Sequence, residues 1–593
     1  MVRPQKRWGA QDPRVAQVAG ASQSASMKPS IIARYTSYET LFGRRSALEE
    51  LVDIVRKYSR ESVIYVCSAA ALLMRIWTRG GFDIQGHDNL VQSFFKPVMA
   101  SSLIALSRLG EPQFVFHRRQ FLLLIKLAIL HGPETGIDLV KEPLGFGDAF
   151  LMANDQFHFA LGGVTPEEKL LNTLTDFVPV IEYSGIRLES EIARAFLLLT
   201  EISPKLRDHP EFIDIPKTFY ALTGVPLLDH FALWFGLFSK FMALDLTTLQ
   251  KDWTELYIRP DFYRTTQIPP ETARKFLDEL TASPQALKNG FSQRDYGSND
   301  FTTLRDKPLV GESNGAVPSD MFFVLEKIQA GPYWRINNSS RQMGDKLRRF
   351  WGPVFEEYVK SLFDQSCSPE INFYQHAPEY EGSTAEQVCD GLLLCGRALV
   401  LLEYKSSMFR AESKYAGQPA LLRTEIEQKF VQNEENNPKG VRQLANAVKR
   451  LFGTGERTSI KGVDLGNIKY VFPVLVTLDS IGRTLMLSRF LHEYFLKELN
   501  DQQFTDPHLF PLLSLYIEDV EVLSGYLGEV PFAQILHNWI EKDSKLISTI
   551  LAIENPTFAA FGARKSDFME QAFDRCYAAI VDRMGLQDDG TII

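Results

Sequence analysis

Apolar residues recur at helical spacing through the first half of the chain. Over residues 46–58, Leu48, Leu51, Val52 and Val55 follow one another every one to four positions, which predicts an amphipathic helix. Pro and Gly mark the joins between such segments. Further helices are predicted over 118–131, 189–202, 228–244 and 270–280. Residues 31–310 are therefore expected to be mainly helical.

The pattern changes after about residue 340. A long helix with aromatic anchors is predicted over 344–363 and a short strand over 370–376. Two apolar strands, 388–395 and 398–404, are separated by Gly396-Arg397, and such a two-residue turn with Gly is typical of a β-hairpin. Helices are predicted over 420–433, 440–452, 483–499 and much of 532–584, and strands over 470–477 and 513–517. This order predicts an α/β fold in which a mixed sheet is flanked by helices.

A chain of 593 residues is long enough for two or more domains. We expect a disordered tail at 1–30, which is basic and rich in small residues, and a helical region of unassigned role at 31–310. Residues 311–343 contain Gly and Pro and are expected to form a linker or a β-containing joint. Residues 344–593 would form the α/β domain with a helical C-terminal extension.

Composition excludes several classes of protein. The formal charge of −9 argues against broad coating of nucleic acid, although a local basic groove would still accommodate DNA. The five Cys and ten His occur without CxxC or HExxH, which favours a reducing cytoplasm and excludes a zinc motif. No apolar run reaches the ~20 residues of a membrane span. No GxxxxGK[ST] sequence occurs, so no nucleotide-binding P-loop is predicted.

The segment with the clearest chemistry is CDGLLLCGRALVLLEYKSS, residues 389–407. Asp390 opens the first predicted strand of the hairpin, and Glu403 and Lys405 close the second. Side chains alternate along a strand, so Glu403 and Lys405 should share one face while Tyr404 points to the other. Carboxylate and carbonyl oxygens are ligands for Mg²⁺, and a nearby lysine can orient a water and stabilise phosphate charge.

This arrangement resembles the PD-(D/E)xK nuclease superfamily over roughly residues 344–480, with Cys389 where the family often has proline. The resemblance implies that Asp390, Glu403 and the backbone carbonyl of Tyr404 ligate the metal, and that Lys405 orients the attacking water. A family glutamate on the preceding helix would be Glu356 or Glu357 in GPVFEEYV. We favour Glu356, as a further ligand of the metal or its water. A family glutamine would be Gln443 in GVRQLANAV, contacting the phosphate or supporting the base.

The resemblance implies a cytoplasmic, Mg²⁺- or Mn²⁺-dependent nuclease acting on DNA, with RNA left open as a substrate. The helical region would position nucleic acid, sense a trigger or form a homo-oligomer. A nuclease joined to a large helical region resembles stand-alone bacterial anti-phage or restriction-type effectors. Two alternatives stay open. The chain could be a catalytically silent nuclease-like fold that binds DNA or serves as an assembly scaffold. The triad could instead be coincidental, a structural salt bridge at a strand end, in a helical interaction scaffold.

Other charged residues have simpler interpretations. The acidic-x-Lys pattern also occurs at Glu167/Lys169, Glu412/Lys414, Glu427/Lys429 and Asp543/Lys545, where polar or helical surroundings suggest solvated pairs. Arg410 and Lys414 are weaker candidates for DNA contact. Asp519 and Glu521 are expected at an exposed strand end. On the helix that carries Gln443, most of the basic residues are expected to face solvent, although they could line a phosphate groove: Lys439, Arg442, Lys449 and Arg450.

Overall fold

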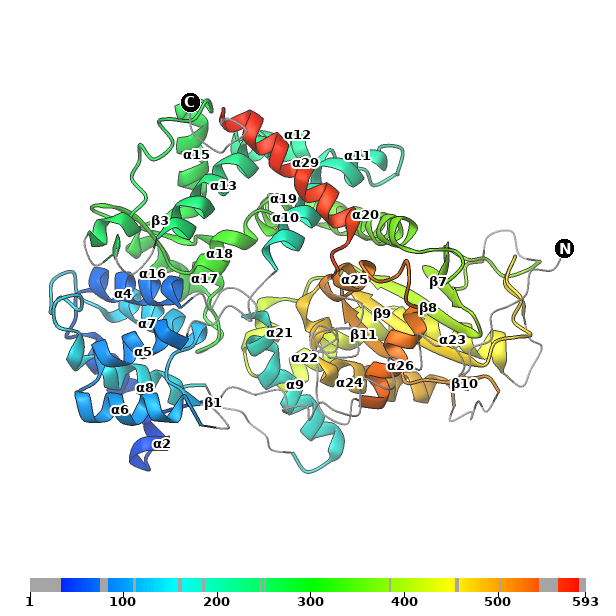
Figure 1. The fold of residues 1–593 in the computed structure, drawn as a ribbon, viewed down its shortest axis with the longest axis horizontal. Helices are drawn as coiled ribbons and strands as arrows, with labels where there is room; N and C mark the ends of the chain where they lie inside the picture. Colours follow the sequence, from blue (N-terminus) through cyan, green and yellow to red (C-terminus); the bar gives the residue numbers. More distant parts are fainter. Residues whose placement is uncertain are drawn as a thin grey trace.

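The computed structural model shows a mainly helical region and a region built around a mixed sheet (Figure 1). It describes residues 34–74, 84–109, 113–157, 163–183, 187–244, 248–249, 252–382, 386–453, 458–500, 504, 506–542 and 564–585. The predicted tail at 1–30 and the Asp543/Lys545 pair lie outside these residues.

The first region is helical, as the periodicity predicts. Its principal helices are α2 (Tyr38–Phe42), α3 (Leu48–Val55), α4 (Arg60–Leu73), α5 (Ile84–Phe94), α6 (Pro97–Leu106), α7 (Arg118–His131), α8 (Gly147–Asp155), α9 (Pro166–Glu182), α10 (Leu188–Phe196), α11 (Ser203–Lys205), α12 (Ile215–Thr223), α13 (Leu227–Ala243), α15 (Pro270–Leu280), α16 (Pro284–Gln293) and α17 (Thr302–Asp306). The short helices are η1 (Pro143–Gly145), η2 (Leu197–Ile202) and η3 (Trp253–Leu256). Strands β1 (Arg34–Tyr35) and β2 (Gln113–Phe114) form a small parallel pair.

Residues 309–340 join the two regions and are well packed. Strands β4 (Leu309–Glu312) and β5 (Gly315–Pro318) pair antiparallel, and β3 (Thr281–Ala282) adds to β4. Helix α18 (Met321–Glu326) is buried along its whole length, and α19 (Ala330–Asn337) follows it. The structured part of this segment is therefore a small sheet and two short helices.

The second region contains a six-stranded mixed sheet. Its strands are β6 (Phe373–His376), β7 (Gly391–Cys395), β8 (Ala398–Lys405), β9 (Tyr470–Thr477), β10 (His508–Leu509) and β11 (Leu513–Tyr516). β6, β7 and β8 pair antiparallel, whereas β9 runs parallel to β8 and both β10 and β11 run parallel to β9. Gly396, with φ of 63°, opens the two-residue turn between β7 and β8, as predicted.

Pro473 explains why two short strands share the outer edge of β9. β10 pairs with Tyr470 and Val471, and β11 pairs with β9 from Val474 onward. The break between them lies opposite the proline, which has no N–H to donate to a neighbouring strand. β8 still pairs with β9 along its full length on the other side.

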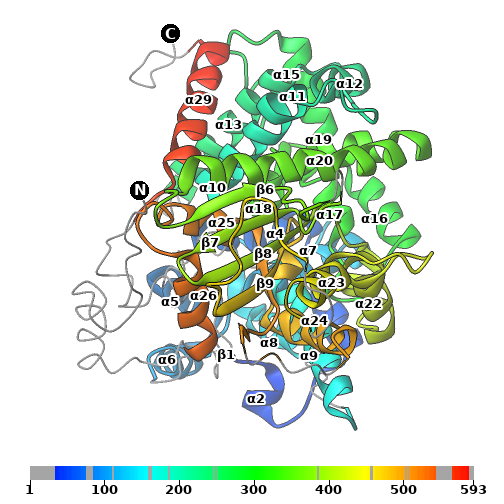
Figure 2. The same ribbon diagram turned by 90° about the vertical axis from the view of Figure 1, so that its right-hand side faces the viewer.

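Helices cover both faces of this sheet. On one face lie α20 (Arg341–Ser366), α25 (Ile517–Ser524) and α26 (Phe532–Lys542). On the other lie α22 (Pro419–Ile426), η4 (Glu427–Val431), α23 (Gly440–Phe452) and α24 (Leu485–Glu498). Figure 2 shows α20 along one side of the strands and α23 and α24 on the other. The remaining helices are α21 (Ala411–Tyr415), η5 (Ser480–Arg483) and α29 (Asp567–Met584).

Two helices cross between the regions. From the helical region, α9 contributes Leu171, Leu174 and Val178 to the apolar core beneath α22 and α24 (Figure 1). From the C-terminal end, α29 packs on α10 and α13. Part of the helical region therefore packs on the sheet region, and the C-terminal helix α29 packs on the helical region.

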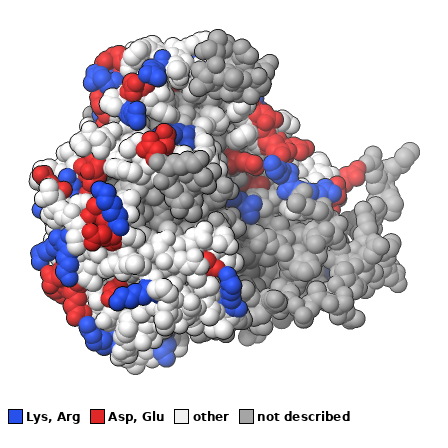
Figure 3. Space-filling model, turned by 60° about the vertical axis from the view of Figure 1, so that its left-hand side comes forward, with Lys and Arg blue, Asp and Glu red and all other residues white. Residues whose placement is uncertain are grey.

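Charges of both signs are mixed on the part of the surface that Figure 3 shows. On the face that Figure 3 shows, Lys and Arg are interspersed with Asp and Glu among the described residues.

Within the described part of the chain, no single helix is long and apolar enough to cross a membrane. Helices α12 and α13, which bend by 69° at their junction, pass that test of length and composition only as a pair.

Candidate functional site

The end of the β7–β8 hairpin brings Asp390 and Glu403 together. Gly391 pairs with Leu402, so the antiparallel register places the preceding Asp390 opposite Glu403. The backbone N–H of Tyr404 donates to Asp390 Oδ2 at 2.7 Å, which fixes that carboxylate against the adjacent strand. The tight turn predicted from Gly396 is what sets this register.

Lys405 lies between these two carboxylates. Its Nζ donates to Glu403 Oε2 at 2.9 Å and lies 4.0 Å from Asp390 Oδ2. Tyr404 points to the other face of the sheet, as strand alternation predicts, where its hydroxyl lies 3.1 Å from that of Tyr374. A Cβ at Gly391 would lie 2.1 Å from the Tyr404 hydroxyl, so a larger residue there would require the tyrosine side chain to move.

The backbone of Tyr404 faces Asp390. In a strand, the N–H and C=O of one residue point toward the same neighbour. The N–H of Tyr404 bonds Asp390, whereas the carbonyl of the next residue, Lys405, accepts from Leu478 beyond β9. The Tyr404 carbonyl therefore points toward the β7 side of β8, the side on which Asp390 lies.

Helix α20 adds Glu356 to the cluster. Glu356 Oε1 lies 3.6 Å from Nε2 of His376, the residue that pairs with Gly391 on β6. Glu357 instead faces Lys360, one turn along the same helix. The pKa of Glu356 is raised by burial, and Asp390 and Lys405 also act on it. Its assignment as a metal ligand remains a prediction.

Burial and crowding raise the pKa of two of these carboxyls. Burial raises the pKa of Glu403 to about 8, with Asp390 adding to the shift and Lys405 opposing it. Burial likewise raises the pKa of Glu356 to about 7, with a further contribution from Asp390. Burial alone would lower the pKa of Lys405, but Glu403 and Asp390 outweigh it and raise that pKa. Lys405 is therefore a stable cation that Glu403 and Asp390 share.

Gln443, on α23, lines a pocket together with Asp390 and Glu403. A polar pocket of about 350 Å³ lies between the segment 386–390 and this helix. Asp390, Glu403 and Gln443 all line it, and so do Lys449 and Arg450 from the same helix. The structure therefore places Gln443 beside the two carboxylates, as the resemblance implies, while its role stays a prediction.

Several residues at this site were not singled out by sequence reasoning. Asn446 lines the pocket one turn after Gln443, and the helical period alone could have identified it. Tyr380 lines the opposite wall, with the Arg450 guanidinium 3.8 Å from its ring centroid. His376 required the register of β6, which the sequence does not fix. Lys439, which the sequence did indicate as a solvent-facing residue or part of a phosphate groove, lies just before α23, and burial and Lys405 lower its pKa.

The donor set fits a hard divalent cation. Asp390 and Glu403 supply two carboxylates, and the Tyr404 carbonyl points to the same side of β8. Such oxygen ligands suit Mg²⁺ or Mn²⁺, and a bound cation would relieve the crowding that raises the carboxyl pKa values. Among the described residues, no three His, Cys, Asp or Glu side chains are grouped to hold a metal. The fit therefore depends on the backbone carbonyl as a third ligand.

Three expectations about neighbouring charges are wrong. Lys414 is not solvated but buried, because it bonds Glu182 and Asp479. Asp519 and Glu521 are also buried, in α25 rather than at an exposed strand end. Both Arg194 Nη1–Glu521 carboxylate distances are 2.8 Å, and α25 begins directly after β11.

The basic residues of α23 divide into two groups. Lys449 and Arg450 line the pocket, whereas Arg442 Nε pairs with Glu498 Oε1 at 2.8 Å. Arg410 is exposed and its Nε lies 3.5 Å from Glu425.

No protein-family model, curated protein or solved structure matches this chain. What the site does is therefore inferred from its geometry and chemistry.

Proposed function

We propose that this chain is a metal-dependent nuclease that hydrolyses DNA phosphodiester bonds, with Asp390, Glu403 and Lys405 at its centre. The observation that carries the proposal is the gathering of two carboxylates, one of them buried, around one lysine beside a polar pocket. Burying the Glu403 carboxylate beside a second carboxylate is costly, so this cluster is understandable if a bound metal ion completes it. The resemblance to PD-(D/E)xK nucleases rests on the same residues and supports the same function.

Each residue of the site would have a role that follows from its chemistry. Asp390, Glu403 and the Tyr404 carbonyl would hold Mg²⁺ or Mn²⁺, which when bound polarises a phosphate and lowers the pKa of its water. Lys405 stays protonated because its pKa is raised, so it acts as a hydrogen-bond donor that orients the attacking water. Glu356, with a pKa of about 7, can accept a proton from that water. The Gln443 amide can donate to a phosphate oxygen.

The pocket limits how the substrate lies. Its volume of about 350 Å³ is near the lower end for ligand sites, which span roughly 300–1,000 Å³. It can admit the phosphate and sugar of one nucleotide but not the full width of a duplex. A duplex would lie across its mouth, with the scissile phosphate directed inward.

The test is cleavage of nucleic acid by purified protein with Mg²⁺ or Mn²⁺. The substrates are supercoiled plasmid, linear duplex, single-stranded DNA and single-stranded RNA. Lys405→Ala should lower the rate by at least about 100-fold, because a positioned charge at the reacting centre is lost. Lys169→Ala is the matched control, since Lys169 ends another acidic-x-Lys triplet but is exposed.

Cleavage by the wild type and Lys169→Ala but not by Lys405→Ala supports the proposal and identifies the substrate. Equal cleavage by all three proteins would contradict it. Wild-type protein that binds DNA yet does not cut it with either metal would favour the silent nuclease-like scaffold instead.

A further inference from the structure

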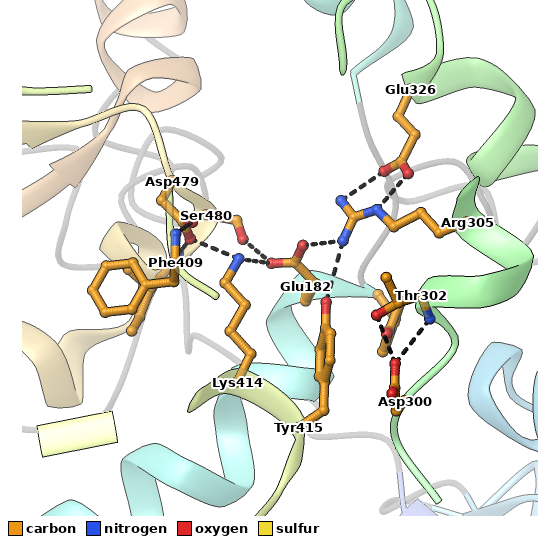
Figure 4. A network of polar contacts seen from close by, with 12 residues as sticks. Glu182, Asp300, Thr302, Arg305, Glu326, Phe409, Lys414, Tyr415, Asp479 and Ser480 are labelled. Atoms are coloured by element: carbon orange, nitrogen blue, oxygen red, sulfur yellow. Dashed lines mark hydrogen bonds and ion pairs between the residues drawn. The ribbon is translucent and has the colours of Figure 1, made fainter. Parts of the chain in front are cut away.

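A buried network of charged side chains joins the helical region to the loops that follow the site strands. It links Glu182 at the end of α9 to Lys414 on α21 and to Arg305 on α17 (Figure 4). Lys414 also pairs with Asp479, and Arg305 with Glu326 at the end of α18. Glu182, Glu326, Lys414 and Asp479 are each at most 6% exposed.

Glu182 is the charged bridge within this network. Its Oε1 lies 2.6 Å from Arg305 Nη1 and its Oε2 lies 2.8 Å from Lys414 Nζ. Ser480 also donates a hydrogen bond to Oε2. Arg305–Glu326 lies on the helical side and Lys414–Asp479 on the sheet side. Glu182 connects these two ion pairs, and Arg305 Nη1 also donates a hydrogen bond to the uncharged Tyr415 hydroxyl beside it.

The sheet side of the network holds the backbone next to the candidate site. Asp479 Oδ2 accepts the N–H of Phe409 at 2.9 Å, and Asp479 Oδ1 lies 2.9 Å from Lys414 Nζ. The residue before it, Leu478, donates its N–H to the carbonyl of Lys405 at 3.0 Å. A continuous set of bonds therefore runs from Glu182 through Lys414 and Asp479 to the strand end that carries Lys405.

We propose that Glu182 is a positioning residue for the candidate site, holding residues 406–415, and with them Lys405, in place from the helical region. The role in catalysis rests on the proposed nuclease function, whereas the structural restraint does not. This restraint gives α9 a function, because through Glu182 the helical region supplies part of the framework of the site. An ordered lysine matters because small displacements of a catalytic group cost large factors in rate.

Charge counting supplies a matched pair of variants. The network has three carboxylates, Glu182, Glu326 and Asp479, and two cations, Arg305 and Lys414. Glu182→Gln leaves the pairs Arg305–Glu326 and Lys414–Asp479 complete but removes the charged bridge. Glu326→Gln also leaves two carboxylates with two cations, yet it keeps the bridge. Both changes are isosteric and buried, so they differ chiefly in the connection to the sheet.

The experiment is hydrogen exchange of the full-length protein, read by mass spectrometry, alongside cleavage kinetics and thermal unfolding. Glu182→Gln should speed exchange in residues 406–415 by roughly tenfold, the effect of losing one charge-assisted bond. It should lower kcat by a similar factor and leave KM unchanged. Glu326→Gln should alter neither exchange there nor kcat, while both variants unfold at similar temperatures.

Equal exchange and equal kcat in the two variants would overturn the proposal, as would an effect of Glu182→Gln on the unfolding temperature alone. If the wild type does not cleave, the nuclease proposal fails and the exchange data still decide whether Glu182 restrains residues 406–415. If Glu182→Gln does not fold, Ser480→Ala removes one bond to Glu182 and should produce a smaller rise at the same residues. No rise in that variant would contradict the proposal.

Discussion

Two clusters of charge lie close together in the chain, around Lys405 and around Lys414. Each lysine ends an acidic-x-Lys triplet, at Glu403 and at Glu412. Around Lys405, two carboxylates lie within 4.0 Å of one cation, and the pKa of Glu403 rises to about 8 because burial dominates. Around Lys414, burial also acts to raise the pKa of Glu182, but Lys414 and Arg305 outweigh it and hold that pKa below its ordinary value.

This difference between the two clusters distinguishes a structural role from a functional one more clearly than the acidic-x-Lys pattern does. Around Lys414, three carboxylates share two cations, but each carboxylate bonds at least one cation, and the Ser480 hydroxyl and the Phe409 N–H add further bonds. In this sense the charges are balanced, as expected of a buried network that supports the fold. Charges around Lys405 are unbalanced and border a pocket. An unbalanced cluster of this kind is suited to binding a cation from solution, and perturbed pKa values concentrate at such sites.

Removing the lysine from the balanced cluster should produce the largest effect on stability. Lys414→Met leaves Glu182 and Asp479 buried with one cation fewer, so we expect a loss of about 3–5 kcal/mol in the free energy of unfolding. Urea denaturation at pH 7.5 measures it.

Lys405→Met is the control for that comparison. It should cost less stability, because Glu403 can take up a proton and Asp390 and Glu356 are partly exposed to solvent. If Lys405→Met destabilises the protein as much as Lys414→Met does, the two clusters do not differ in how strongly they depend on their lysine.

The affinity of the protein for Mn²⁺ should depend on pH. The free-energy change should be smaller than the loss of stability expected for Lys414→Met. Glu403, a proposed ligand of the metal, has a pKa raised to about 8, so below this value a proton competes with the metal ion. Affinity should therefore rise with pH, by about tenfold per unit for each proton displaced, and level off above pH 8. Calorimetric titration between pH 6 and 9 measures this, and an affinity that is constant over that range would count against the unbalanced cluster.

Local patterns in the sequence predicted most of the elements and the core of the site. The helix at 440–452 and the strand at 470–477 have the predicted bounds, because their apolar periodicities are long and unbroken. The approach of Asp390 to Glu403 followed from a two-residue turn between matched strands. These features depend only on residues that lie near one another in the chain.

Features that depend on distant partners were not predicted. The burial of Lys414 depends on Glu182, which lies 232 positions away, and that of Glu521 on Arg194, which lies 327 positions away. The amphipathic pattern of α9 shows that the helix has an apolar face, but not that this face meets the sheet region. An acidic-x-Lys triplet likewise does not reveal how many cations surround it in the fold.

The central claim is that the Lys405 cluster is completed by a divalent cation, and thermal unfolding with and without Mn²⁺ at pH 8.5 tests it most directly. The variant is Asp390→Asn, whose amide oxygen can still accept the Tyr404 N–H. Without metal it should be as stable as the wild type or more stable by about 1 kcal/mol, because one of several crowded charges is removed.

Mn²⁺ at about 100 times its dissociation constant should stabilise the wild type by about 2.7 kcal/mol and leave Asp390→Asn unchanged. Equal stabilisation of the two proteins, or none in either, would contradict the assignment of this cluster as a metal site.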